Sequence, residues 1–176
     1  MQSDFRDTEI GLIPTDWRIV KLKDIATIQS GGTPSRKQPE YYGGTVPWVK
    51  TLDLNNGAVT FTQEQITKEA LTAVRGKIRP HNTVMVAMYG GAGTIGKSGI
   101  LKIQAATNQA VCCIEPNEDK FDPEYLHSYM IYMRPEWMKY AIGTRKDPNI
   151  SKGVIENHLV PLPPLPEQRR IAAVLN

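Results

Sequence analysis

Hydrophobic residues along this chain fall into short blocks that are separated by polar, glycine-rich segments. Short apolar blocks bounded by turn residues are typical of β-strands. We therefore expect strands at residues 17–22, 46–50, 83–89, 100–103 and 109–116. The block TVMVAMY at 83–89 is apolar at consecutive positions, which predicts a strand buried on both faces. A short helix is expected at 67–73, where Thr67 is a favourable N-cap residue.

A different hydrophobic pattern begins after residue 121. Asp122 is a good N-cap, and Pro123 suits the first helical position. Pro135 should break or kink the predicted helix, because proline lacks a backbone N–H. The apolar residues of this segment repeat every three or four positions and predict one helix face: Leu126, Tyr129, Met130, Met133 and Trp137.

The last residues change character again. Four prolines lie between positions 161 and 166, which predicts a stiff extended segment. A helix is expected from about Glu167, and its apolar face would contact a partner or another helix through Ile171, Val174 and Leu175. A helix of about ten residues is marginal alone in water. We therefore divide the chain into a domain at 1–160 and a linker with the first turns of a longer helix at 161–176.

The composition is that of a globular protein. The chain has 176 residues, of which 40% are hydrophobic and 22% are charged, which excludes a disordered or collagen-like protein. No run of about eighteen apolar residues is present, so no membrane-spanning segment is expected. The first residues lack the basic and apolar regions of a signal peptide. We expect a cytoplasmic protein.

The charge distribution says more than the net charge of +3. No acidic residue lies between Glu69 and Glu115, and the basic residues of that stretch are Arg75, Lys77, Arg79, Lys97 and Lys102. Such a run is compatible with a surface that faces an anion such as nucleic acid. On charge alone, ordinary solvated charges on strands and loops are the preferred interpretation.

Neither the cysteines nor the histidines have the spacing of a metal site. Cys112 and Cys113 are adjacent, so on a strand they would point to opposite faces and could not grip one metal ion. His81, His127 and His158 are scattered. We interpret both cysteines as packing residues, and we expect no metal or cofactor in this chain.

One segment matches a catalytic motif. Residues 91–98, GAGTIGKS, fit the phosphate-binding pattern G-x-x-x-x-G-K-[ST] and follow a predicted strand. A functional loop of this kind must also open a helix, and the residues SGILKIQ that follow show no helical period. A glycine-rich hairpin is the preferred interpretation, and a nucleotide-binding enzyme remains the alternative.

Taken in order, the segments resemble a known family. The opening includes WRIVKLKDIATIQSGGTPSRK, the middle GGAGTIGKSGILKIQAATNQAVCCIEP, and the end PLPPLPEQRRIAAVLN. Together they resemble the target recognition domain of the specificity subunit of type I restriction–modification enzymes, from about residue 12 to the last. In that family the glycine-rich T-I-G-K segment is expected on a strand, without a nucleotide.

The resemblance implies a non-catalytic subunit that recognises one half-site of a bipartite double-stranded DNA target. Separate modification subunits would bind S-adenosylmethionine and methylate adenine, and restriction subunits would translocate and cut. The implied fold is α+β: an irregular, twisted, β-rich part at 12–116, a helical part at about 122–158, and the start of a long spacer helix. Family members usually carry two recognition domains, whereas this sequence has one. We expect either a piece of a longer subunit or a half-subunit that pairs with another recognition domain.

The resemblance does not transfer base-reading roles, so the candidate DNA contacts come from residue chemistry. They lie in polar loops and basic segments: Arg36, Lys37, Lys50, Arg75, Tyr89, Lys97, Arg145 and Lys146. Arg36 and Arg145 are the expected base readers, because a guanidinium fork matches guanine. The lysines are expected to bind phosphates. Asn108 and Gln109 suit either DNA contact or a structural amide role. A protein-interaction module on the same scaffold is a further alternative.

Overall fold

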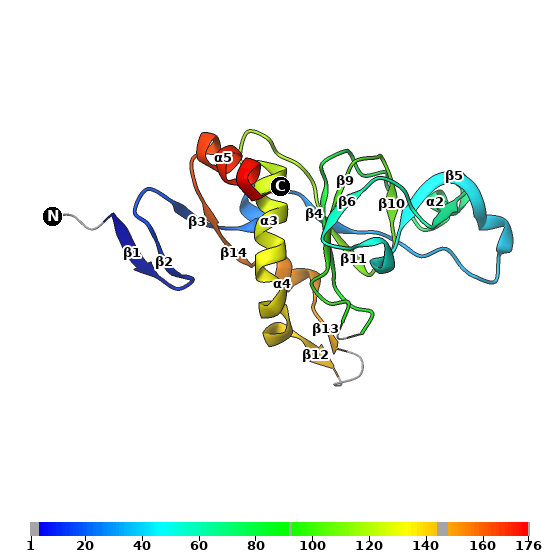
Figure 1. The fold of residues 1–176 in the computed structure, drawn as a ribbon. Coiled ribbons are helices and arrows are strands. Elements are labelled where there is room, and N and C mark those ends of the chain that lie inside the picture. The colour runs from blue at the N-terminus through cyan, green and yellow to red at the C-terminus, as the bar shows by residue number, and fades with distance from the viewer. Residues whose placement is uncertain (1–3, 92, 144–147, 176) are drawn as a thin grey trace.

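The computed structural model describes residues 4–91, 93–143 and 148–175 of the chain, and these form an elongated molecule of several sheets and short helices (Figure 1). The strands are β1 Phe5–Thr8, β2 Gly11–Pro14, β3 Arg18–Lys21, β4 Ile28–Ser30, β5 Tyr42–Val49, β6 Gly57–Val59, β7 Glu64–Ile66, β8 Val84–Ala87, β9 Ser98–Leu101, β10 Ala106–Thr107, β11 Val111–Ile114, β12 Ile142–Gly143, β13 Pro148–Asn149 and β14 Leu159–Leu162. The α-helices are α1 Leu22–Ile25, α2 Lys68–Ala73, α3 Pro123–Met133, α4 Lys152–Glu156 and α5 Leu165–Leu175.

A five-stranded sheet forms the centre, in the order β4-β11-β8-β9-β6. Every residue of β8, β9 and β11 is buried, as the apolar pattern of 83–89 predicts for β8. Cys112 and Cys113 point to opposite faces of this sheet, and each packs in a different hydrophobic cluster. Both are free and buried, which confirms their interpretation as packing residues.

A smaller three-stranded sheet, in the order β10-β5-β7, lies at one end of the molecule together with α2 (right side of Figure 1). Its core contains Val46, Trp48 and Ile66. Thr67 caps α2 as predicted, since its side chain accepts a hydrogen bond from the backbone N–H of Ala70 at 3.1 Å. This end of the molecule carries several of the candidate DNA contacts.

The helical part forms largely as the sequence predicts. Asp122 caps α3 by accepting from the backbone N–H of Tyr125 at 3.0 Å, and α3 packs on both the central sheet and α5. The α-helix ends at Met133, and the chain continues through Pro135 as the 3-10 helix η3 Arg134–Tyr140. Strands β12 and β13 also fall in this part, and β14, which follows it, pairs with β3 near the start of the chain.

The C-terminal segment is less extended than its prolines predict. Helix α5 begins at Leu165 rather than near Glu167, and the carbonyl of Pro164 accepts from the N–H groups of Glu167 and Gln168. Pro166 fits there because the first turn of a helix leaves its N–H groups without intrahelical partners. The division at residue 160 stays a prediction, and that position lies inside β14. Within the described ranges no helix is both long and apolar enough to cross a bilayer.

A buried arginine connects the edge of the central sheet to the segment before β8. The side chain of Arg79 is 3% exposed, and its Nη1 donates to Glu115 at 2.6 Å and to Gln29 at 2.8 Å. Its Nη2 also donates to the carbonyl of Ser30 at 3.2 Å. A buried cation needs such partners because water cannot solvate it. Arg79 therefore serves the fold, although it belongs to the acid-free stretch.

Replacing this arginine tests its role in stability. Arg79→Met leaves three acceptors on two segments without their donor, so we expect the free energy of unfolding to fall by about 3 kcal/mol. The control is Lys139→Met, which breaks an exposed ion pair with Glu136 and should leave the free energy of unfolding almost unchanged. Urea unfolding of both variants measures the difference. Equal losses would contradict a structural role specific to Arg79.

Candidate nucleic-acid interface

The loop between β4 and β5 lies directly against the turn that precedes β11. Backbone N–H groups of Gly31 and Gly32 donate to the carbonyls of Asn108 at 3.2 Å and Thr107 at 3.0 Å. A Cβ on Gly31 would lie 1.8 Å from the carbonyl oxygen of Thr107, so this approach requires glycine. Two loops that are far apart in sequence thus form one surface.

A third segment joins these two through side chains. The Thr33 hydroxyl donates to the amide oxygen of Gln109, and the same amide hydrogen-bonds the side chain of Tyr89. Tyr89 follows β8 and forms a β-bridge with Asn149. Partial burial raises the pKa of the Tyr89 hydroxyl, so it remains a neutral donor at physiological pH. The Gln109 side chain therefore connects the loop that contains Thr33 to the segment that contains Tyr89.

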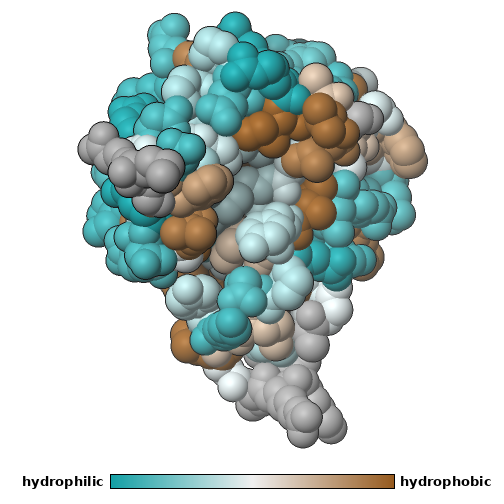
Figure 2. Space-filling view, turned by 60° about the vertical axis from the view of Figure 1, so that its left-hand side comes forward, coloured by the Kyte–Doolittle hydropathy of each residue, from teal (hydrophilic) through white to brown (hydrophobic). Residues whose placement is uncertain are grey.

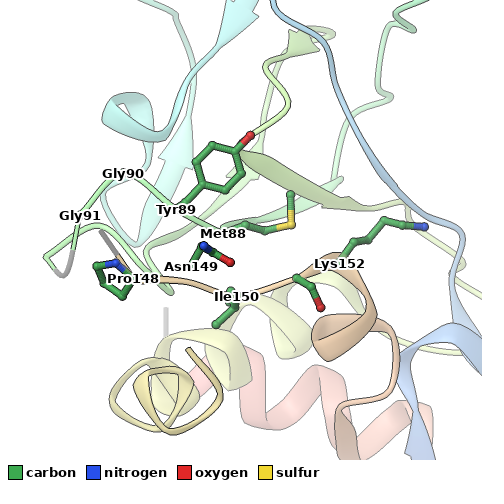
Figure 3. Close-up of a pocket in the computed structure, with 9 residues that line it drawn as sticks. Met88, Tyr89, Gly90, Gly91, Pro148, Asn149, Ile150 and Lys152 are labelled. Atoms are coloured by element: carbon green, nitrogen blue, oxygen red, sulfur yellow. The ribbon is translucent and has the colours of Figure 1, made fainter. Parts of the chain in front are cut away.

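Tyr89 also borders a hollow of about 620 Å³. In Figure 3, Tyr89, Gly90 and Gly91 lie on one side of this hollow, and Pro148, Asn149 and Ile150 lie across from them. The predicted contacts Arg145 and Lys146 lie outside the described residues. The strands β12 and β13 on either side of them pair with each other.

Arg36 is held in a tight cluster with Glu64 and Lys50. Its Nη1 and Nη2 donate to the two carboxylate oxygens of Glu64 at 2.6 and 2.8 Å, and Lys50 Nζ reaches the same carboxylate at 2.5 Å. The Arg36 guanidinium carbon lies 4.1 Å from the centroid of the Tyr42 ring and 5.6 Å from that of Trp48. Bidentate pairing and stacking together fix both the position and the plane of a guanidinium.

Strand register explains how this cluster forms. Strands β5 and β7 are antiparallel, and Glu64 is the direct partner of Trp48. Residues two apart on a strand point to the same face of the sheet, and directly paired residues of neighbouring strands do so too. Lys50, just beyond the end of β5, is therefore on the same face as Trp48 and Glu64. The pairing thus places one carboxylate within reach of a cation that follows β5 and a cation from the preceding loop.

The turn that carries Arg36 is anchored on both sides. The Tyr42 hydroxyl donates to the carbonyl of Pro34 at 2.6 Å, and Trp48 Nε1 donates to the carbonyl of Gly32 at 3.2 Å. Between these anchors, the N–H of Gln38 donates to the carbonyl of Ser35 at 3.1 Å and closes the turn. Arg36 therefore projects from a rigid support, which is favourable for recognition.

The other described candidates lie around this cluster or near Tyr89. Lys37 is exposed beside Arg36. Arg75 follows α2 with a φ of +50°, a conformation that favours glycine, and the adjacent Val74 packs against Gly32. Lys97 is partly buried in the turn before β9, on the same hairpin as Tyr89. The structure thus brings Arg36, Lys37, Lys50 and Arg75 to one end of the molecule, while Lys97 lies with Tyr89.

The segment that matches a phosphate-binding loop has a different structure. Residues 91–98 connect the antiparallel strands β8 and β9, and Ser98 pairs with Val86 instead of opening a helix. Gly96 has a φ of +71°, and a Cβ there would lie 2.5 Å from Cδ1 of the buried Trp137. The glycines therefore serve turn geometry and packing. The family expectation of a strand over Thr94–Lys97 is also wrong, because these residues form the turn before β9.

Among the described residues no group of three or more His, Cys, Asp or Glu could hold a metal ion.

Comparison with protein families identifies the chain. The model of the family described as the type I restriction modification DNA specificity domain matches residues 14–176. The chain belongs to this family.

Curated relatives of this specificity domain carry corresponding names. The type I restriction enzyme MjaIX specificity subunit of Methanocaldococcus jannaschii is 30% identical over 99% of this chain and 40% of its own length. The EcoR124I/EcoR124II specificity subunit of Escherichia coli is 24% identical over 92% of this chain and 40% of its own length. The specificity domain spans about two fifths of each relative.

Solved structures share the fold of the specificity domain. The HsdS subunit from Thermoanaerobacter tengcongensis has a TM-score of 0.72 and 22% identity, and the match covers 98% of this chain and 39% of that one. The S subunit of a type I restriction–modification system from M. genitalium has a TM-score of 0.65 and 13% identity over 90% of this chain and 37% of that one. The mixed helix and strand arrangement is therefore that of the family.

Sequence analysis did not identify Glu64 as part of the site of the specificity domain. It is the one acidic residue between Asp53 and Glu69, but nothing in the local pattern indicates that two cations face it. Its role depends on the register of β5 and β7 and on the path of the loop that carries Arg36. The sequence signal for Glu64 is that it is an isolated acidic residue at the start of a short strand, between basic candidate residues.

The predicted partner face of the specificity domain is only partly buried. Ile171 packs toward the core, whereas Val174 and Leu175 are 85% and 64% exposed. Ile171 and Leu175 line an apolar hollow of about 490 Å³ with Trp17, Tyr129 and Tyr132. Figure 2 shows this side of the molecule, where apolar residues gather beside hydrophilic ones.

Titration of Glu64 tests the charge cluster of the specificity domain. Hydrogen bonding to Arg36, with a further contribution from Lys50, lowers the pKa of Glu64 from 4.5 to about 2. Because the folded-state pKa is depressed, the cluster stabilises the fold above pH 4.5, and this contribution is lost as the pH falls toward 2. In Arg36→Ala the pKa of Glu64 should rise toward its ordinary value.

Carboxyl carbon NMR measures this titration directly. The control variant Lys139→Ala breaks the exposed pair with Glu136 and should leave the titration of Glu64 unchanged. A wild-type Glu64 that titrates near pH 4.5 would show that the cluster does not persist in solution.

Proposed function

We propose that this chain recognises one half-site of a bipartite double-stranded DNA target, as the non-catalytic specificity component of a type I restriction–modification complex. The observation that carries the proposal is the convergence of three polar loops on one surface, with Arg36, Lys37, Lys50 and Arg75 grouped at one end. Membership of the DNA specificity domain family supports it.

The chemistry of this surface suits duplex DNA. Arg36 offers N–H donors on the side of its guanidinium that Glu64 does not occupy, and Lys37 and Arg75 offer exposed charges for phosphates. Gly90 and Gly91, in the turn that follows Tyr89, let the backbone approach phosphate oxygens closely. Tyr89 extends the surface along the hollow that Figure 3 shows, and Lys97 follows on the same hairpin. We propose that Arg145 and Lys146 also contact DNA.

Partners follow from the same proposal. The curated relatives are named as specificity subunits of type I restriction enzymes. We propose that this chain likewise acts with modification and restriction subunits in the cytoplasm, and that S-adenosylmethionine is bound by the modification subunit and not by this chain. The apolar face with Ile171, Val174 and Leu175 is proposed to contact another helix, a second recognition domain or a half-subunit.

Salt dependence and sequence selection test this function together. We expect the chain, mixed with its modification subunit, to enrich a short motif from a randomised duplex pool. If about five phosphates are contacted, the log–log plot of affinity against salt should have a slope near −4.5. Arg75→Ala and Lys37→Ala should each reduce this slope by about 0.9 and weaken binding to all sequences alike.

The matched control is Lys139→Ala, which removes an exposed cation on η3 and should change neither motif nor slope. A protein-interaction module would be favoured instead by two results together. The chain would enrich no motif and show no such salt slope on any DNA, and it would still bind a protein partner.

A further inference from the structure

We propose that Glu64 is a specificity-determining positioning residue. It fixes the Arg36 guanidinium so that the edge not bonded to Glu64 contacts one guanine. It also weakens the non-specific binding of phosphates by Arg36 and Lys50. This inference rests on the proposed function, and it adds a residue that makes no DNA contact itself.

The first step of the argument is the geometry of the fork. Glu64 accepts from Nη1 and Nη2, which occupies the end of the guanidinium, and the Tyr42 ring covers one of its faces. An arginine has five N–H donors, so the side edge of the guanidinium still carries donors for another acceptor. The Arg36 side chain is 56% exposed, so Glu64 and the two aromatic rings leave part of it in contact with solvent, and the inference requires that this part includes the side edge.

The second step identifies the ligand. Guanine presents O6 and N7 as two acceptors in the major groove, and this is the pattern that a planar two-donor edge matches. Glu64 is a poor base reader itself, because its two oxygens already accept from Arg36 and Lys50. A cytosine amino group would have to share a carboxylate that already pairs with two cations. The cluster therefore favours a guanine contact through Arg36.

The third step concerns phosphates. Two cations share one carboxylate, so the cluster carries a net charge of about one rather than two. Glu64 also repels a phosphate that approaches the same cations. Since phosphate contacts supply most non-specific affinity, Glu64 lowers binding to arbitrary DNA while it orders the base-reading edge.

These two effects predict opposite changes when the carboxylate is neutralised. Glu64→Gln keeps the size of the side chain and one acceptor, but it frees positive charge on Arg36 and Lys50. We expect affinity for random duplex to rise about threefold, and the ratio of cognate to random affinity to fall about tenfold. A side chain with only a structural role would lower both affinities together.

The test uses the duplex that the wild-type chain selects with its modification subunit. Each guanine of that duplex is replaced in turn by 7-deazaguanine, which removes the N7 acceptor. One replacement should weaken wild-type binding about tenfold, and Arg36→Ala should lose the sensitivity at that position alone. Arg36→Lys should lose it too, because lysine lacks the fork. Glu136→Gln is the control, since it also removes one carboxylate that pairs with a cation, but on η3.

The outcomes separate this inference from the proposed function. A selected motif whose 7-deazaguanine profile is unchanged in Arg36→Ala would overturn the inference and leave the proposed function standing. Equal losses of cognate and random affinity in Glu64→Gln would likewise overturn it. A wild-type chain that selects no motif would overturn both. Changes in Glu136→Gln as large as those in Glu64→Gln would show that net charge alone is responsible.

Discussion

The loop after β4 approaches the turn before β11 so closely that no side chain can stand between them. Gly31 meets the Thr107 carbonyl in the space where a Cβ would lie, and Gly32 lies against both Thr107 and Val74. This contact fixes the path of the loop that carries Arg36. It also brings Thr33 to Gln109 and, through Gln109, to Tyr89. The candidate interface depends on this one backbone approach.

The charged side chains on this surface are held in fixed positions by ion pairs and aromatic contacts. Glu64 draws two cations from different segments to one point, and two aromatic rings set the plane of one of them. Arg79, in contrast, is buried and serves the sheet. In the acid-free stretch of the sequence, Arg75 and Lys77 are thus exposed, whereas Arg79 stabilises the core. Net charge alone would not separate these two roles.

Much of the fold follows from local sequence, because its elements have local causes. The cap at Asp122, the end of α3 before Pro135 and the buried strand β8 all depend on neighbouring residues. The pairing of β14 with β3 and the cluster around Glu64 depend on contacts distant in sequence, so local patterns could not predict them. Helix α5 begins about two residues before the position that the sequence predicts, because prolines in the first turn of a helix resemble an extended segment.

Hydrogen exchange of the chain with and without bound DNA tests the central claim most directly, because it reports which backbone segments the ligand covers. Our account predicts that DNA slows exchange together in residues 31–42 and 107–110 and at Tyr89–Gly91, and leaves the exposed face of α5 unchanged. Protection confined to α3 and α5, with no change in the loop that carries Arg36, would contradict it.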